Sequence, residues 1–122
     1  MEAVMNVGQI MQREVCTCHP TDSLRRAAEV MWTGCCGSLP VVGEDGQVVA
    51  IVTDRDLCMA ACREGLAPES TCVSKIASRE VLVIREDASA EEAEMLMRKH
   101  HVRRLPVVDR GGRPVGILSL YD

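Results

Sequence analysis

The tetrapeptide Leu39-Pro40-Val41-Val42 recurs as Leu105-Pro106-Val107-Val108, 66 residues further along the chain. The same offset aligns apolar, turn and acidic residues on both sides of the tetrapeptide, in the same order: Val7 with Val73, Ile10 with Ile76, Val15 with Val81, Ala27 with Ala93, Met31 with Met97, Gly46 with Gly112, Val49 with Val115, Ile51 with Ile117, and Asp56 with Asp122. This repeat predicts two copies of one supersecondary unit, each too small to close a hydrophobic core alone.

The composition is that of an ordinary globular protein. The chain has 122 residues, 47% hydrophobic and 26% charged, which predicts one compact domain made of two fused halves. A net charge of −4, with Trp32 and Tyr121 as the only aromatic residues, argues against a nucleic-acid surface. No apolar run is long enough to span a membrane, and residues 1–5 lack the features of a secretory signal. We therefore expect a cytoplasmic protein with no nucleic-acid or membrane partner.

Seven cysteines are a high and odd number for this length. Because the aliphatic residues suffice for a core, we expect thiols that act as small apolar fillers in a reducing compartment. Two clusters, Cys16-Thr17-Cys18-His19 and Cys35-Cys36, could instead converge on a metal ion or form a reversible disulfide. No Cys-x-x-Cys pair occurs, so no metal site is predicted, but a disulfide between the clusters stays open. Cys58 and Cys62, four residues apart on a predicted helix, are expected to pack.

The first half of each repeat is expected to form a strand followed by a helix. In the first repeat a short strand at 15–18 precedes a helix capped within residues 21–23. Gly34 is expected to end this helix in the left-handed conformation. In the second repeat the strand is at 81–84, and Asp87 or Ser89 caps the helix. The apolar stripes of the two helices are Leu24, Ala27, Ala28, Met31 and Trp32 in the first, and Ala93, Leu96 and Met97 in the second.

The second half of each repeat is expected to form a hairpin and a further helix. Strands at 38–42 and 47–52 pair in the first repeat, and strands at 105–108 and 115–118 pair in the second. A helix follows Thr53 in the first repeat. The matching helix of the second repeat begins within residues 119–122 and is not completed by the sequence.

The order β-α-β-β-α predicts an α+β fold, in which small mixed sheets are covered by helices. We divide the chain into a first repeat at 7–64, a linker at 65–72 rich in turn-forming residues, and a second repeat at 73–122. A short apolar stretch, from Val7 to Met11, is expected to form a turn of helix that leads into the first repeat.

A signature follows each tetrapeptide, namely Ala50-Ile51-Val52-Thr53-Asp54-Arg55-Asp56 and Gly116-Ile117-Leu118-Ser119-Leu120-Tyr121-Asp122. With the apolar-Pro-Val-Val strand and the glycine turn, it resembles the CBS domain, and the pair resembles a Bateman module of the stand-alone bacterial, hypoxic-response type. The resemblance implies two repeats packed with pseudo-two-fold symmetry and a homodimer. It also implies an adenosine-containing ligand, such as AMP, ADP, ATP or another adenosyl compound, in the cleft between the repeats, with no required cofactor.

The signature itself is suited to hold a ribose. Thr53 and Asp56 are three residues apart at a predicted helix start, so they lie on one face, and the first turn offers N–H groups to an anion. Ser119 and Asp122 are the matching pair. A purely structural role stays open, because the hydroxyls could cap the helices and the carboxylates could complement the helix dipoles.

Cations for a phosphate group are placed unevenly along the chain. The resemblance implies that the two residues before the second tetrapeptide, Arg103 and Arg104, face the cleft, and guanidinium groups suit bidentate phosphate contacts. Arg55 is a third candidate. The matching residues of the first repeat, Gly37 and Ser38, carry no charge and permit close approach of a ring. We assign the adenine-facing wall to Gly37, Ser38, Cys18, Pro40, Val102 and Pro106.

These features predict a regulatory sensor module rather than an enzyme, because no nucleophile–base pair, dinucleotide loop or metal triad occurs. Two alternatives stay open. The first is a redox- or metal-responsive dimer in which cysteines carry the signal, and the second is a purely structural dimerisation module.

Overall fold

The computed structural model describes residues 5–119, which form two compact units. The central unit consists of residues 16–81, and the terminal unit consists of residues 5–15 together with 82–119. Each unit has its own hydrophobic core. Leu39 is fully buried in the first core and Leu105, its repeat partner, is buried in the second. The recurring tetrapeptide therefore supplies the centre of both cores.

The central unit combines one antiparallel hairpin with helices. Its elements are α2 (Leu24–Gly34), β1 (Ser38–Val42), β2 (Val48–Thr53), α3 (Asp54–Cys58), the π-helical turn η1 (Met59–Arg63) and the 3-10 turn η2 (Val73–Lys75). The strand predicted at 15–18 was wrong in length, since only Cys18 forms a bridge, parallel to Val41. The chain turns away at His19, whose N–H donates to the Asp22 carboxylate over 2.9 Å.

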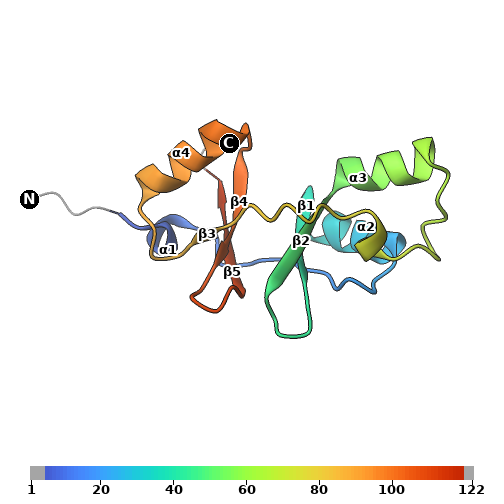
Figure 1. The fold of residues 1–122 in the computed structure, drawn as a ribbon, viewed down its shortest axis with the longest axis horizontal. Coiled ribbons are helices and arrows are strands. Elements are labelled where there is room, and N and C mark those ends of the chain that lie inside the picture. Colours follow the sequence, from blue (N-terminus) through green and yellow to red (C-terminus); the bar gives the residue numbers. More distant parts are fainter. Residues whose placement is uncertain (1–4, 120–122) are drawn as a thin grey trace, which may run out of the picture. The chain divides into compact units, whose positions relative to one another are not determined.

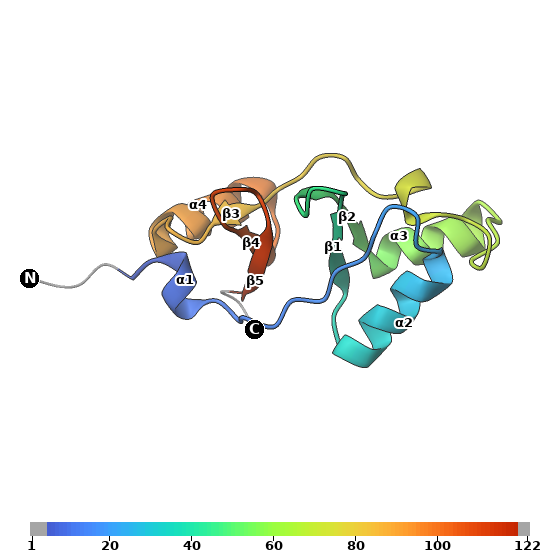
Figure 2. The ribbon, with the colours of Figure 1, turned by 90° about the horizontal axis from the view of Figure 1, so that it is seen from below.

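The terminal unit contains a three-stranded sheet in the order β3-β4-β5. Its elements are α1 (Val7–Ile10), β3 (Ile84–Arg85), α4 (Ala90–His100), β4 (Arg104–Val108) and β5 (Pro114–Ser119). β3 is parallel to β4, and β4 is antiparallel to β5. The helix predicted to begin within 119–122 lies, apart from Ser119, outside the described residues. The small sheets, antiparallel in the central unit and mixed in the terminal unit, together with the helices beside them, confirm the α+β fold class (Figures 1 and 2).

The N-caps and the buried stripes of α2 and α4 agree with the sequence predictions, except at two residues of the α2 stripe. Ser23 and Ser89 are the N-caps of α2 and α4, and each hydroxyl accepts an N–H from the third helical residue. Trp32, predicted on the buried stripe, is 86% exposed, and Ala28 is exposed as well. Met31 fills the core position of the last turn, and the next residue is rotated by about 100° away from it.

The end of α2 also differs from the prediction. Gly34 is helical, and the left-handed residue is Cys35, with φ of 52°. The Cys36 N–H returns to the Met31 carbonyl over 3.0 Å, which closes a Schellman motif. That pattern requires a left-handed residue directly before Cys36. The left-handed conformation is therefore imposed on Cys35 by the hydrogen bonds, even though glycine stands one position earlier.

The first residues of each repeat complete the core of the unit that contains most of the other repeat. Val7 of α1 is buried in the core of the terminal unit, and Gln12 pairs with Ile117 at the edge of β5. Their repeat partners do the same in the central unit, where Val73 is buried in the core and Ser78 pairs with Ile51. Among the described residues, no helix is both long enough and apolar enough to cross a bilayer.

Candidate functional site

Thr53 and Asp56 bind each other where β2 ends and α3 begins. The Asp56 N–H donates to the Thr53 hydroxyl over 3.1 Å, and the Thr53 N–H donates to Asp56 Oδ2 over 2.9 Å. This reciprocal arrangement is a capping box, and both residues are partly buried. The cap uses a hydroxyl lone pair and one carboxylate oxygen. The hydroxyl proton and Oδ1 remain available for a ligand, so the cap holds the pair in place without using up its hydrogen-bonding capacity.

Gly37 and Ser38 lie next to this pair. Ser38 is the direct cross-strand partner of Thr53 in the hairpin. The Asp54 N–H donates to the Gly37 carbonyl over 2.9 Å, and a Cβ on Gly37 would lie 3.2 Å from Asp54 Oδ2. Four predicted site residues of the first repeat are thus brought together. Arg55 is exposed, and its N–H donates to Asp54 Oδ1 over 2.8 Å.

An open hollow of about 360 Å³ lies beside the same residues. Gly37 is the predicted site residue in its wall, and the other lining residues are Met31, Trp32, Cys35, Cys36 and Asp54. Asp54 lines the hollow without having been predicted as a site residue, although its position directly after Thr53 could have indicated it. Trp32 was assigned to the core instead. The carboxylate of Asp54 makes this hollow a poor place for a phosphate group.

The terminal unit presents cations at the matching position. Arg104, the first residue of β4, is the direct cross-strand partner of Ser119, the last described residue of β5. Residues opposite each other in antiparallel strands have Cβ atoms about 5 Å apart. Arg103 and Arg104 are exposed, and Val102 is partly buried. Asp122 lies outside the described residues.

Three residues assigned to the adenine-facing wall are buried inside their own units. Cys18 is only 2% exposed, and Pro40 and Pro106 are buried in the centres of β1 and β4. Burial, and secondarily the Asp22 carboxylate, raise the pKa of Cys18 from 9.0 to about 11. This thiol therefore stays protonated, and unreactive, at neutral pH.

The cysteines form neither a disulfide nor a metal cluster in the described part of the chain. All seven lie within residues 5–119, and none of them is bridged to another. No group of three or more His, Cys, Asp or Glu side chains in that range is arranged to hold an ion. The expectation that Cys58 and Cys62 pack into the core was wrong, since both are exposed. The two thiols contact each other, and a hydrogen bond with Cys62 raises the pKa of Cys58.

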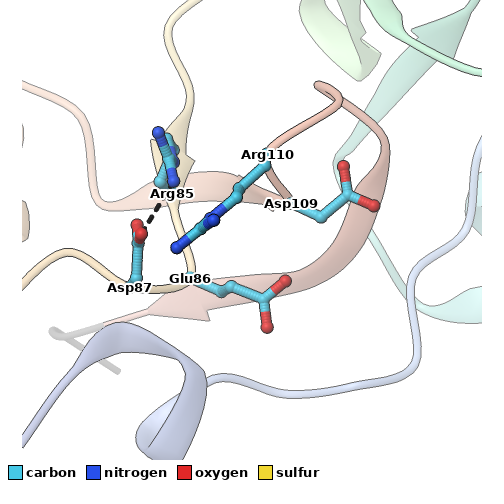
Figure 3. Close-up of a pocket in the computed structure, with 5 residues that line it drawn as sticks. All are labelled: Arg85, Glu86, Asp87, Asp109 and Arg110. Atoms are coloured by element: carbon cyan, nitrogen blue, oxygen red, sulfur yellow. Dashed lines mark hydrogen bonds and ion pairs between the residues drawn. The ribbon is translucent and has the colours of Figure 1, made fainter.

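A second hollow, of about 400 Å³, lies in the terminal unit and is lined only by charged residues (Figure 3). They come from β3 and the residues after it, and from the β4–β5 turn: Arg85, Glu86, Asp87, Asp109 and Arg110. Arg85 and Asp87 form an ion pair of 2.7 Å. No predicted site residue lines this hollow.

The family of the chain follows from comparison with known proteins. The model of the CBS domain matches twice, over residues 7–62 and 73–122. The chain belongs to the CBS domain family. The resemblance drawn from the two signatures is thus confirmed.

Several curated proteins are similar to this CBS pair. The uncharacterized protein MK0525 of Methanopyrus kandleri is 33% identical over 97% of this chain, and the inosine-5'-monophosphate dehydrogenase of Methanocaldococcus jannaschii is 32% identical over 100%. This chain spans only 60% and 23% of their lengths. The CBS domain-containing protein YhcV of Bacillus subtilis is 35% identical over 96% of this chain and 81% of its own length.

Solved structures of CBS pairs share the fold. Hypoxic Response Protein I, solved with two coordinated zinc ions, has a TM-score of 0.84 and 30% identity, and covers 94% of this chain and 92% of its own. The CBS pair of MJ0100, in complex with 5'-methylthioadenosine and S-adenosyl-L-methionine, has a TM-score of 0.83 and 27% identity over 96% of this chain and 90% of its own. CBSX2 of Arabidopsis thaliana, in complex with AMP, has a TM-score of 0.79 and 29% identity over 93% and 89%.

Proposed function

We propose that this chain is a regulatory module that binds an adenosine-containing ligand and has no catalytic activity of its own. Two CBS pairs that resemble this chain, with TM-scores of about 0.8 and more than 25% identity, have been solved with adenosine-containing ligands. One is in complex with AMP, and the other is in complex with 5'-methylthioadenosine and S-adenosyl-L-methionine. These ligands share the adenosine moiety and differ in what is attached to it. The shared recognition element is therefore the nucleoside.

The observation that carries the proposal is the geometry of Thr53 and Asp56. A ribose presents two neighbouring hydroxyl groups, each of which donates and accepts a hydrogen bond. Thr53 offers a hydroxyl proton and Asp56 offers Oδ1, both held by the capping box. Because these groups are fixed before the ligand arrives, binding loses little side-chain entropy. The capping role and the ribose role are compatible, and the structure does not force a choice between them.

A phosphate group is better matched by the terminal unit than by the central unit. Arg104 stands opposite Ser119, whereas the corresponding pair in the central unit is Ser38 and Thr53. Asp54 adds a negative charge beside Gly37 in the central unit. We therefore assign the phosphate contacts of AMP, ADP or ATP to Arg103 and Arg104, with Arg55 as a further contact.

The proposed module acts by a shift between conformations. A ligand shifts such an equilibrium only through its different affinities for the two states. In this proposal the two repeats, 7–64 and 73–122, are joined by the linker 65–72 and act together. The chain works as a homodimer in the cytoplasm, and the dimer reports to a partner protein whether the ligand is bound. Size measurement with and without ligand tests the homodimer.

Calorimetric titration with AMP, ADP, ATP and S-adenosylmethionine tests the function and the site together. Asp56→Asn keeps an oxygen that accepts the Thr53 N–H, so the helix cap survives, but it removes the carboxylate charge. We expect at least a tenfold weaker affinity, about 1.4 kcal/mol, for the ligand that binds. Thr53→Val is expected to weaken binding similarly, whereas Thr53→Ser retains the hydroxyl and the affinity.

The controls separate the site from general damage. Asp87→Asn removes an exposed carboxylate of the terminal unit, and Arg110→Ala removes a cation from the other end of the hairpin that begins at Arg104. Neither change is expected to alter the affinity. Equal binding by Asp56→Asn and wild type would contradict the site, and silence of the whole ligand panel would contradict the function and favour a structural dimerisation module.

A further inference from the structure

The sulfur atoms of Cys16 and Cys36 in the central unit both lie close to one point, the position that a Cβ on Gly34 would occupy. That point is 2.6 Å from Cys16 Sγ and 3.3 Å from Cys36 Sγ. The two cysteines are distant in sequence, since one precedes α2 and the other follows it. The absence of a side chain at Gly34 therefore leaves the two thiols next to each other.

The local structure fixes this proximity. The Schellman motif at the end of α2 turns the chain back, so that the Cys36 N–H reaches the Met31 carbonyl. Cys36 is thereby directed over the last turn of the helix. Both Cys16 and Cys36 are partly buried and pack against the core that contains Met31.

The terminal unit shows that this packing does not require sulfur. The repeat partners of Cys16 and Cys36 are Leu82 and Val102, which likewise pack, partly buried, against the core of their unit. An aliphatic pair thus serves the same structural purpose in the second repeat. His100 stands where the first repeat has Gly34. The central unit differs by having two thiols next to a glycine.

We propose that Cys16 and Cys36 form a reversible disulfide within the central unit. This inference does not depend on the adenosine-ligand proposal. The oxidant is hydrogen peroxide: the two S–H bonds and the O–O bond break, the S–S bond forms, and the two oxygen atoms, each taking up one thiol proton, leave as two water molecules. A small dithiol restores the thiols through a mixed disulfide and is itself oxidised to a cyclic disulfide.

The other thiols are less suited to this reaction. Cys18 is buried and stays protonated, as its raised pKa of about 11 indicates. Cys35 is adjacent to Cys36 but is exposed and takes the left-handed conformation at the cap. Cys58 and Cys62 contact each other on the exposed side of a helix and are the main competing pair.

The disulfide would act directly beside the proposed ligand residues. Cys36 and Gly37 line the same hollow as Trp32 and Asp54. A bond from Cys36 to Cys16 ties this wall covalently to the segment that enters the central unit. Oxidation is therefore expected to restrict Gly37 and Ser38, and Trp32, the only tryptophan, provides a fluorescence signal for the change.

The test is peroxide oxidation of the full chain, followed by alkylation and peptide mapping without reductant. Trypsin leaves Cys16 and Cys18 in peptide 14–25, and it leaves Cys35 and Cys36 in peptide 27–55. We expect these two peptides to be linked, and the link to disappear after treatment with dithiothreitol. We also expect the melting temperature of the oxidised chain to rise by about 5 °C or more, because the bond closes a loop.

Variants identify which sulfurs are joined. Cys18→Val and Cys35→Ser are expected to retain the linked peptides, whereas Cys36→Val, which introduces the residue of the second repeat, abolishes them. Gly34→Ala keeps all thiols but places a methyl group against both sulfurs, which must shift away from it, and is expected to slow formation of the link at least tenfold. A link that survives in Cys36→Val, an unchanged rate in Gly34→Ala, or bridging of Cys58 to Cys62 instead would overturn the proposal. Wild-type mapping with fragmentation of the linked peptides decides the case if a variant does not fold.

Discussion

The central and terminal units have nearly the same backbone but different chemistry at matched positions. Both helices end in a left-handed residue, Cys35 with φ of 52° and His101 with φ of 54°, and both hairpins shift register after the fourth pair. At other matched positions the two units carry different side chains. The pairs, with the central unit first, are Cys16 and Leu82, Cys18 and Ile84, Gly34 and His100, Cys36 and Val102, and Ala50 and Gly116. The comparison shows that backbone hydrogen bonds and core volume preserve the unit, while the residues around them are free to acquire separate functions.

The largest expected effect comes from exchanging Ala50 and Gly116 between the units. A Cβ on Gly116 would lie 2.6 Å from Met11 Sδ and 2.7 Å from the Gln12 carbonyl oxygen. Gly116→Ala is therefore expected to lower the free energy of unfolding by about 2 kcal/mol, as overpacking does. Urea denaturation measures the loss. Ala50→Gly, the reverse exchange in the central unit, is expected to cost only about 0.5–1 kcal/mol, and a loss for Gly116→Ala no larger than this would contradict the close approach.

An effect of similar size, confined to high pH, is expected from the thiol of Cys18. The pKa of this thiol is about 11 in the folded chain, against 9.0 for an ordinary cysteine. Between pH 9 and 11 the thiol keeps its proton in the folded chain and loses it in the unfolded chain. The free energy of unfolding is therefore unaffected by this thiol below pH 9 and falls as the pH rises above 9. The loss is roughly 2 kcal/mol at pH 11. Ile84, the matched residue, cannot titrate.

The matched control for this prediction is Cys18→Val, which keeps an apolar side chain in the core. The difference in free energy of unfolding between wild type and Cys18→Val is expected to change between pH 9 and 11 and to stay constant from pH 6 to 8. Parallel curves over the whole range would show that the Cys18 pKa is not raised.

The smallest expected effect comes from the two left-handed cap residues. A non-glycine residue in this conformation lowers the free energy of unfolding by about 1 kcal/mol relative to glycine. Cys35→Gly and His101→Gly are therefore each expected to stabilise their unit by up to about 1 kcal/mol, measured by thermal unfolding. Gly34→Ala does not relieve this strain, because Gly34 is already helical. Destabilisation by both glycine substitutions would contradict the cap geometry.

Much of the fold could be read from local patterns. The tetrapeptides, the turns and the serine caps specify hairpins and helix starts within a few residues, where spacing alone decides the geometry. β1 coincides with the range predicted for it, Ser38–Val42. The hairpin register, which sets Ser38 opposite Thr53 and so brings Gly37 and Ser38 next to Thr53 and Asp56, came from the structure.

The sequence by itself determined that the chain is a tandem duplication with two hairpins and two capped helices. Only the tertiary structure decided that Val7 completes the core of the terminal unit and Val73 that of the central unit. It also decided that Trp32 faces solvent and that Cys16 meets Cys36 at Gly34. The physical reason is that periodicity and capping act over one or two turns, whereas these contacts join segments far apart in sequence, whose meeting depends on how the whole unit closes around its core.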